Sequence, residues 1–317
     1  MTTLLVASTG GHLAELHDLV PRLGVRDRRW VTFDSPQSRS LLDGEDVVHV
    51  PPATSRDLSA AVRGLLVARR MFRGQRYEQV ISTGASIAMS FFVPATAAGV
   101  KCTYIESATR TDGPSLTGRM AAKLPNTRLY TQYRSWADET WRYGGSIFDS
   151  FTAEPVGPRP VRKVVVTLGT HGRYTFPRLL TRLVEIMPPG LEVLWQVGAT
   201  RIEEMPAGAR AQVPISELCQ AMSEADVVVS HAGVGSALTA MQAGRRALYV
   251  PRRCAYGEHV DDHQVGMAQE LQSRDLVVAR EACDVTFADL EAAAAWSVRS
   301  VRGVEPFRLT PVDSSVL

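Results

Sequence analysis

The residues best suited to chemistry lie between positions 226 and 264. A glycine-rich turn, His231-Ala232-Gly233-Val234-Gly235-Ser236, follows an apolar run that ends at Val229. Glycines in such a turn let the backbone bend sharply and let a ligand come close to it. If a helix begins there, its first N–H groups have no partner within the helix and favour an anion such as phosphate. The turn therefore predicts a site for a phosphorylated ligand, most simply a nucleoside diphosphate.

The same turn also has a purely structural interpretation. Glycine turns join strands to helices with or without phosphate, and Leu238 stands where the third glycine of the dinucleotide fingerprint would fall. A second polar cluster, EHVDDHQ at 258–264, follows the next apolar run. Both clusters should then lie at the carboxyl ends of parallel strands, where open α/β sheets bind ligands. The second cluster favours the ligand-binding interpretation.

A similar unit opens the chain. Leu4–Ala7 is an apolar run of strand length, Ser8-Thr9-Gly10-Gly11-His12 is a turn, and apolar residues at helical spacing follow. Asp34 ends the next run and could hold the ribose of a nicotinamide cofactor. Because residues 9–14 give no G-x-G-x-x-G motif, we do not expect that cofactor.

Apolar runs and helical patterns alternate along the chain, which predicts parallel sheets with helices on both faces. The stretch 154–160 is proline-rich, as linkers between domains often are. An alanine-rich helix is expected at 286–300, and a polar, loosely packed segment from Phe307 onward. We expect a first domain, a linker, a second domain and a tail at residues 1–154, 155–162, 163–302 and 303–317.

Composition excludes several classes of protein. The 317 residues are 45% hydrophobic and 21% charged, as in soluble globular proteins, and the net charge of +2 does not indicate a nucleic-acid partner. The four cysteines are scattered, without the spacing of a disulfide framework or a zinc site. Neither a signal peptide nor an apolar run of about 18 to 20 residues is present, so a cytoplasmic protein is expected.

One helical pattern, at residues 57–77, is both apolar and strongly basic. It contains five arginines, and no acid falls between Asp57 and Glu78. Such a helix suits an anionic membrane surface. A core helix with a solvated basic face has the same pattern, so both interpretations stand at this point.

The motifs of the two halves resemble a known family. Those of the first half are similar to the acceptor half of the two-subunit N-acetylglucosaminyltransferase acting on dolichol-diphosphate sugar: STGGHLAEL at 8–16, STGASIA at 82–88 and YIES at 104–107. Those of the second half resemble its donor-binding subunit: VVVTLGTHG at 164–172, SHAGVGS at 230–236 and EHVDDHQ at 258–264. This is the layout of GT-B glycosyltransferases of family 28, which includes bacterial exopolysaccharide transferase pairs. The resemblance implies an α/β fold of two Rossmann-like parallel-sheet domains facing a cleft, with both subunits fused in one chain.

The resemblance also implies a function. An inverting glycosyltransferase would move a hexose-type sugar from a UDP-sugar to a saccharide acceptor, expected on polyprenyl diphosphate, in cell-surface polysaccharide or glycolipid synthesis. The protein would lie in the cytoplasm, peripherally on the inner face of the plasma membrane, with the helix at 57–77 touching the lipid. Three alternatives remain open: a transferase with a soluble small-molecule acceptor, a UDP-sugar epimerase of the same fold, and a non-catalytic subunit that docks a partner transferase.

The resemblance assigns the UDP-sugar to the second half. The diphosphate would rest on residues 233–236 and be closed in by Gly169 and Thr170, with uracil near Ile215. The residues at 262–264 would bind the sugar hydroxyls. The full donor-binding set is Gly169, Thr170, His171, Ile215, His231, Gly233, Val234, Gly235, Ser236, Thr239, Glu258, Asp262, His263 and Gln264.

Two positions bear on the donor's identity. The family usually has a glutamate that grips the ribose where this chain has Thr239, and a threonine cannot make a charged bidentate pair. Arg252 and Arg253 could pair with the carboxylate of a uronic acid, or they could be ordinary surface arginines.

Inverting sugar transfer needs a base for the acceptor's proton and N–H groups or positive charge for the leaving diphosphate. His12 is the preferred base because its ordinary pKa, near ~6.5, is close to working pH. Glu106 is the rival, since it also ends a strand, although the histidine could merely cap a helix and the glutamate merely fix a loop. Since the chain has no Asp-x-Asp motif, we expect neither a metal nor another cofactor. Acceptor contacts are expected at Gly10, Gly11, Gly84 and Ser107.

Overall fold

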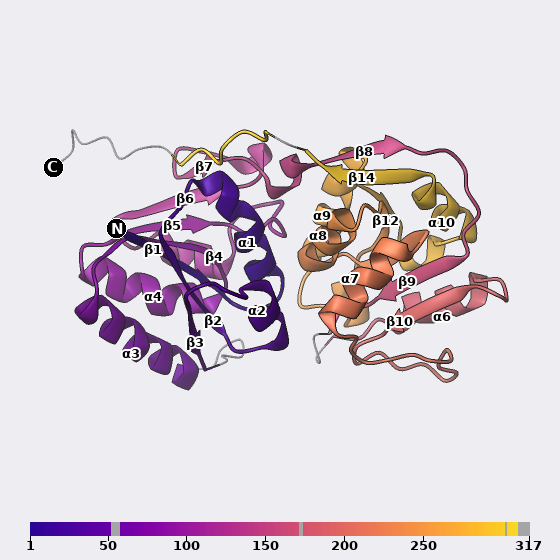
Figure 1. The fold of residues 1–317 in the computed structure, drawn as a ribbon, viewed down its shortest axis with the longest axis horizontal. Helices are drawn as coiled ribbons and strands as arrows, with labels where there is room; N and C mark the ends of the chain where they lie inside the picture. The colour runs from indigo at the N-terminus through magenta and orange to yellow at the C-terminus, as the bar shows by residue number, and fades with distance from the viewer. Residues whose placement is uncertain (52–57, 171–173, 302, 310–317) are drawn as a thin grey trace. The chain divides into compact units, whose positions relative to one another are not determined.

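The computed structural model of the chain describes residues 1–51, 58–170, 174–301 and 303–309, with the backbone alone at 58–61. The chain forms two compact units (Figure 1), Met1–Ile147 with the chain from Gly303, and Phe148–Arg302. The boundary between the units therefore falls after residue 147 rather than at the expected 154. The segment from Gly303 belongs to the first unit and is not a separate tail.

The first unit is built on a seven-stranded sheet of order β3-β2-β1-β4-β5-β6-β7, in which every neighbouring pair is parallel. Alternate residues of β1 point to opposite faces of this sheet. The strands are β1 (Thr2–Ala7), β2 (Arg28–Phe33), β3 (Val47–Val50), β4 (Tyr77–Gly84), β5 (Lys101–Ile105), β6 (Thr127–Thr131) and β7 (Trp141–Tyr143).

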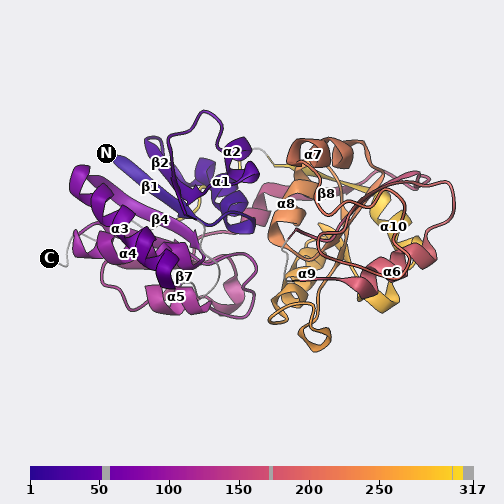
Figure 2. The same ribbon diagram turned by 90° about the horizontal axis from the view of Figure 1, so that it is seen from below.

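Helices cover both faces of the first sheet, as its apolar strands require. One core contains Leu4 and Val6 of β1 with Phe91 of α4 and Ala121 of α5. The helices α3 and α4 lie side by side (Figure 2), and α1 packs against β1 and β4. In the part of the chain that the structure describes, no helix is long and apolar enough to cross a membrane. The helical segments are α1 (Gly11–Leu23), α2 (Pro36–Leu41), α3 (Leu58–Gly74), α4 (Ser86–Ala97), α5 (Leu116–Ala121) and η1 (Arg134–Trp136).

The second unit contains a five-stranded parallel sheet of order β10-β9-β11-β12-β13. Val164 and Val166 of β9 join a core with α6 and α10, whereas Val165 joins a core with α7 and α8. The strands are β9 (Lys163–Thr167), β10 (Glu192–Gln196), β11 (Val227–His231), β12 (Ala247–Val250) and β13 (Val277–Ala279). The helical segments are η2 (Ile147–Ser150), α6 (Pro177–Ile186), α7 (Ile215–Glu224), α8 (Val234–Gln242), η3 (Cys254–Tyr256), α9 (His263–Ser273), η4 (Ala282–Asp284) and α10 (Phe287–Ala294).

A two-stranded antiparallel ribbon corrects the helix expected at 286–300. The helix α10 ends at Ala294, and β14 (Trp296–Ser300) pairs with β8 (Phe151–Pro155) (Figure 1). Val298, opposite Ala153 in this ribbon, is only 2% exposed. The alanine-rich composition favours a helix, but pairing with a strand far away in the sequence decides the local structure.

The expectation of a loosely packed segment from Phe307 is also wrong for the described residues. The Phe307 side chain is 3% exposed, and its ring centroid lies 6.0 Å from that of Tyr130. Its backbone N–H donates to the carbonyl of Arg22 at 2.9 Å. At Gly144 an added Cβ would lie 2.2 Å from the Phe307 ring, so the glycine makes room for it. One aromatic side chain thus anchors this segment to the first unit.

Candidate functional site

Both predicted sites lie at points where the order of strands reverses. In the first sheet the chain turns in opposite directions after β1 and β4, which are neighbours. In the second sheet the same is true of β9 and β11. Open α/β sheets bind ligands at the carboxyl ends of such strand pairs. The topology therefore marks one candidate site in each unit.

His12, in the first turn of α1, is held by the end of β4. Its Nδ1 lies 2.8 Å from the carbonyl oxygen of Thr83, and the Thr83 hydroxyl donates to the His12 carbonyl at 2.8 Å. A carbonyl oxygen only accepts, so Nδ1 must carry the hydrogen and Nε2 is the basic nitrogen of the neutral ring. Gly84 has φ of +108°, and a Cβ there would lie 3.1 Å from His12 Cε1. This glycine therefore makes room for the imidazole.

The other predicted acceptor residues surround the same strand ends. Gly10 lies directly before α1, which Gly11 begins. The Gly10 N–H donates to the Gln37 side chain at 2.6 Å, and the Gln37 amide donates back to the Gly10 carbonyl at 3.0 Å. Ser107 follows β5 and is buried. The structure thus groups these residues in the first unit, around the carboxyl ends of β1, β4 and β5.

Glu106, the rival base, is 1% exposed and holds a loop together. Its Oε2 accepts the backbone N–H of Ser115 at 2.9 Å and the Ser115 hydroxyl at 3.1 Å. Its Oε1 accepts from the N–H of Ser107 at 3.3 Å and from the hydroxyl of Tyr104 at 3.4 Å. Burial raises the pKa of Glu106 above its usual range. Both oxygens are therefore occupied by structural hydrogen bonds.

Glu15 is a buried acid that the sequence analysis missed. It is 0% exposed on α1, and its carboxyl group accepts from the Ala108 N–H at 2.7 Å, the Ser107 hydroxyl at 2.9 Å and the Gln132 amide. Burial raises the pKa of Glu15 to about 8, although these hydrogen bonds act in the opposite direction. The available signal was its position four residues before the buried Leu19, on the same face of the helix.

In the second unit, His231 ends β11 and packs between two glycines. Its Nδ1 lies 3.4 Å from the carbonyl oxygen of Thr167, at the end of β9. A Cβ at Gly169 would lie 2.9 Å from the His231 ring, and one at Gly233 would lie 2.5 Å from its Nε2. Burial lowers the pKa of His231 to about 3, so the ring is neutral at physiological pH. These glycines are therefore required by the packing of His231 as well as suited to a ligand.

The helix α8 begins beside His231. Gly233 is its N-cap, and among the described residues no side chain caps this end. Its first N–H groups, those of Val234, Gly235 and Ser236, are thus available for an anion. The Thr239 hydroxyl donates to the Gly235 carbonyl at 2.9 Å, which leaves it able to accept but not to donate a second bond.

The polar cluster after β12 is anchored by buried charges. Glu258 is 2% exposed and accepts from Arg178 Nε at 2.8 Å and Nη2 at 2.9 Å, and from the Arg253 N–H at 3.0 Å. The Gln264 side-chain oxygen accepts the Arg252 N–H at 2.9 Å. Since Glu258 is engaged in this way, its visible role is to hold the loop.

Arg252 is not a surface arginine. It is 2% exposed, its Nη2 donates to the carbonyls of Leu168 and Tyr174, and its Nε has no hydrogen-bond partner in the described part of the chain. Burial lowers the pKa of Arg252 to about 10. Arg253, by contrast, is partly exposed and lies 3.8 Å from Glu281.

The remaining predicted donor residues are less constrained. Thr170 is exposed after Gly169, and Ile215, the first residue of α7, is 36% exposed. Asp262 is the N-cap of α9, its Oδ1 accepts the Cys254 N–H at 2.8 Å, and His263 begins the helix. His171 lies outside the described residues. All described members of the donor set belong to the second unit, and both candidate bases belong to the first.

The chain is similar to known glycosyltransferases. Residues 163–284 match the glycosyltransferase family 28 C-terminal domain. One relative is 26% identical to the chain and covers 90% of it and 78% of its own length: the UDP-N-acetylglucosamine–N-acetylmuramyl-(pentapeptide) pyrophosphoryl-undecaprenol N-acetylglucosamine transferase of Sorangium cellulosum.

Solved structures share the fold. MurG of Acinetobacter baumannii has a TM-score of 0.53 at 18% identity, over 92% of this chain and 89% of its own. A putative UDP-N-acetylglucosamine 2-epimerase of Listeria monocytogenes has a TM-score of 0.54 at 12% identity, over 93% of each chain. At these identities the likenesses establish the fold, which is that of the GT-B glycosyltransferases. Residues 163–284 thus resemble the C-terminal domain of glycosyltransferase family 28, and the protein is a UDP-sugar-dependent glycosyltransferase.

Proposed function

We propose that this protein transfers a hexose-type sugar, with inversion, from a UDP-sugar to a saccharide carried on a polyprenyl diphosphate. The observation that carries the proposal is the open N-terminus of α8, which begins next to the reversal point between β9 and β11. Backbone N–H groups in that position suit a diphosphate. The relative from Sorangium cellulosum is named as an N-acetylglucosamine transferase with a pyrophosphoryl-undecaprenol acceptor, which supports both substrate classes.

In the proposed reaction, an acceptor hydroxyl attacks the anomeric carbon of the donor sugar. Its proton passes to Nε2 of His12, while the bond between that carbon and the diphosphate oxygen breaks and UDP leaves. The bond from Nδ1 to the Thr83 carbonyl, at 2.8 Å, orients the ring and presents Nε2 as the acceptor. The N–H groups at the start of α8 stabilise the negative charge that develops on the diphosphate.

We favour His12 over Glu106 as the base because of their hydrogen bonds. Both carboxylate oxygens of Glu106 accept bonds from the loop that it holds, and the side chain is 1% exposed. The Nδ1 of His12 donates to the Thr83 carbonyl, and this bond fixes the orientation of the ring. Glu106 then serves to shape the loop that carries Ser107.

The proposed location is the cytoplasmic face of the plasma membrane, with α3 in contact with anionic lipid. Val62 and Leu66 on this helix are 55% and 59% exposed and lie one helical turn apart. Arg69 and Arg73 follow on the same stripe of the helix and are exposed. Apolar side chains bordered by arginines match the chemistry of an anionic membrane surface.

Thermal stability against a panel of nucleotides tests the donor site. A ligand at a hundred times its Kd should stabilise the folded protein by about 2.7 kcal/mol. We expect UDP, UDP-N-acetylglucosamine, UDP-glucose and UDP-glucuronic acid each to raise the thermal stability, and the size of the increase to rank their affinities. ADP, GDP and NAD should have no effect. Stabilisation by NAD or purine nucleotides alone would contradict the proposed donor class.

A glycine variant provides a matched control for that experiment. Gly233→Ala would place a Cβ 2.5 Å from His231 Nε2 and should abolish the UDP shift. Gly74→Ala, where an added Cβ meets nothing within 4 Å, should keep it.

The alternative enzyme classes would behave differently. An epimerase would release a second sugar product without any lipid acceptor, and the activity of a soluble-acceptor transferase would not depend on lipid.

A further inference from the structure

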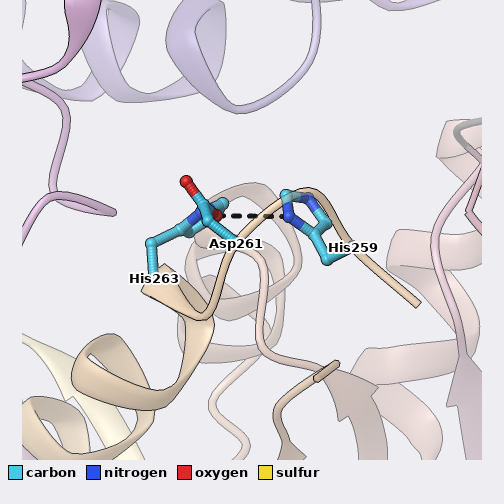
Figure 3. A group of neighbouring side chains, drawn as sticks. All are labelled: His259, Asp261 and His263. Carbon is cyan, nitrogen blue, oxygen red and sulfur yellow. Dashed lines mark hydrogen bonds and ion pairs between the residues drawn. The ribbon is translucent and has the colours of Figure 1, made fainter. Parts of the chain in front are cut away.

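Two histidines and an aspartate converge on the loop that leads into α9 (Figure 3). His259, Asp261 and His263 alternate with other residues, and each offers one ligand atom within 4.8 Å of the others. His259 Nδ1 lies 3.4 Å from Asp261 Oδ1, and His263 Nδ1 contacts the same oxygen. No part of the proposed sugar transfer requires this arrangement.

The buried nitrogen of His259 needs an explanation. Its Nδ1 is buried and has no hydrogen-bond partner among the described residues, although Asp261 is near. A buried polar group without such a partner destabilises the fold. A bound cation at this point would satisfy the nitrogen and the neighbouring carboxylate together.

The surroundings hold the two rings in place. The ring centroids of Tyr174 and His259 lie 4.5 Å apart. The imidazoles of His259 and His263 meet edge to face, with their centroids 4.6 Å apart. His263 is further fixed because it begins α9. The positive charge of Arg252 also acts on His259 and opposes a cation there, whereas Asp261 favours one. The site thus has pre-positioned nitrogen ligands and one compensating negative charge.

We propose that His259, Asp261 and His263 bind one divalent transition-metal ion through the two Nδ1 atoms and a carboxylate oxygen. Two imidazoles with one carboxylate suit zinc, cobalt or nickel better than magnesium or calcium, which prefer oxygen ligands. Tetrahedral ligands at about 2.1 Å from a zinc ion lie roughly 3.4 Å apart. The distance of 3.4 Å between His259 and Asp261 already fits.

The ion would fix the loop before α9 rather than take part in sugar transfer. It would link His259, on the loop, to His263, at the helix start, and leave a fourth position for water. The proposal departs from the expectation that the protein holds no metal. It does not rest on the proposed donor site, although His263 belongs to the predicted donor set.

Titration of the full chain with Co²⁺ tests the site, because cobalt bound by nitrogen and oxygen ligands absorbs visible light. We expect one equivalent to bind, Zn²⁺ to displace it, and millimolar Mg²⁺ or Ca²⁺ to have no effect. Asp261→Asn and His263→Ala should each weaken binding at least about tenfold. His17→Ala removes another histidine that lies 3.3 Å from an aspartate, Asp18, and should bind Co²⁺ as the unaltered chain does.

Two outcomes would overturn the proposal: absence of a stoichiometric cobalt spectrum, or unchanged binding in both the Asp261 and His263 variants. Because Asp261 is 37% exposed, Asp261→Asn should fold normally, and its thermal unfolding without metal should match that of the unaltered chain. The same variant should keep its stabilisation by UDP. Loss of metal binding and loss of donor binding can therefore be told apart.

Discussion

At the scale of single residues, the candidate chemistry depends on hydrogen bonds that fix the state of a side chain. The Thr83 carbonyl fixes the tautomer of His12, and burial keeps His231 neutral. Glycines at 84, 169 and 233 allow these rings to lie against the backbone. The residue types in the two turns thus follow from packing around histidine as much as from the needs of a ligand.

His12→Ala should lower kcat by about 100-fold or more and leave the KM for the UDP-sugar nearly unchanged. Removing a general base typically lowers the rate by 10²–10⁴, and His12 lies in the first unit, away from the predicted donor residues in sequence. Steady-state kinetics with a lipid-linked acceptor measure both constants. Glu106→Gln provides the comparison: if it abolishes turnover while His12→Ala does not, the assignment of the base is wrong.

Glu15 should make stability depend on pH. Burial raises its folded-state pKa from the ordinary value of 4.5 to about 8, so the folded protein holds a proton that the unfolded chain releases between these values. Its contribution to stability is fully present below pH 4.5 and falls as pH rises, by up to about 1.4 kcal/mol per pH unit. Glu15→Gln, which cannot ionise, should gain stability relative to the unaltered chain from pH 5 to pH 8.

Urea unfolding at several pH values measures that difference. Glu217→Gln is the control, because Glu217 is exposed and its Arg210 partner lowers rather than raises the pKa of the carboxyl group. The urea midpoints of Glu217→Gln should change with pH in the same way as those of the unaltered chain. Parallel pH profiles for Glu15→Gln and the unaltered chain would show that Glu15 is ionised in the fold.

Candidate residues in glycine turns could be recognised from the sequence, because the backbone there tolerates few residue types. Buried charged residues could not be recognised in this way. His12 and Gly233 stand out because glycine turns between strand and helix have recognisable patterns. Glu15 and Arg252 were missed or left open because burial of a charge depends on partners distant in sequence. Glu258 was assigned to the donor, yet the structure pairs it with Arg178, 80 residues away.

At the scale of elements, α3 presents one stripe of mixed character. Val62, Leu66, Arg69 and Arg73 are spaced so that they share a face of the helix, and all four are exposed. The opposite side carries Ala68, which is buried in the core against the sheet. α3 packs on α4 with one face, and its other face is exposed. This division explains why the sequence pattern allowed both a core helix and a helix that contacts a membrane.

Charge reversal on this stripe should weaken membrane binding. Arg69→Glu with Arg73→Glu removes two cations, each worth about 1 kcal/mol near an anionic surface, and adds two repulsive charges. We expect binding to vesicles containing anionic lipid to fall at least tenfold, as measured by sedimentation. Arg26→Glu with Arg142→Glu makes the same change in net charge at other exposed positions of the first unit and should have less effect. Equal losses in the two double variants would exclude a specific role for α3.

Elements defined by local pattern were predicted well, and those defined by pairing were not. The apolar runs that became β1, β9 and β11 are continuous because parallel strands are buried on both faces. The ribbon of β8 and β14 was missed although both strands alternate apolar and polar residues, because its pairing joins residues about 145 positions apart, such as Val298 and Ala153. Phe307 was missed because its partner, Tyr130, lies far away in the sequence.

At the scale of the whole molecule, each unit has its own sheet and its own hydrophobic core. Ligand binding to one unit then stabilises that unit directly, because linkage acts on whichever folded region forms the site. The described donor residues all belong to the second unit. UDP should therefore stabilise the second unit more than the first.

Hydrogen exchange with and without UDP should detect this inequality. We expect slower exchange in the second unit, strongest at the turn 231–236 and around 262–264, because bound diphosphate occupies N–H groups at the start of α8 and stabilises the adjacent loop. Amides of β2, β3 and β7 in the first unit should exchange at unchanged rates, since their opening does not involve the donor. Protection centred instead on residues 8–12 and 82–84 would place the nucleotide at the reversal point of the first sheet. His12 would then be a nucleotide ligand, and its assignment as the base would fail with that of the donor site.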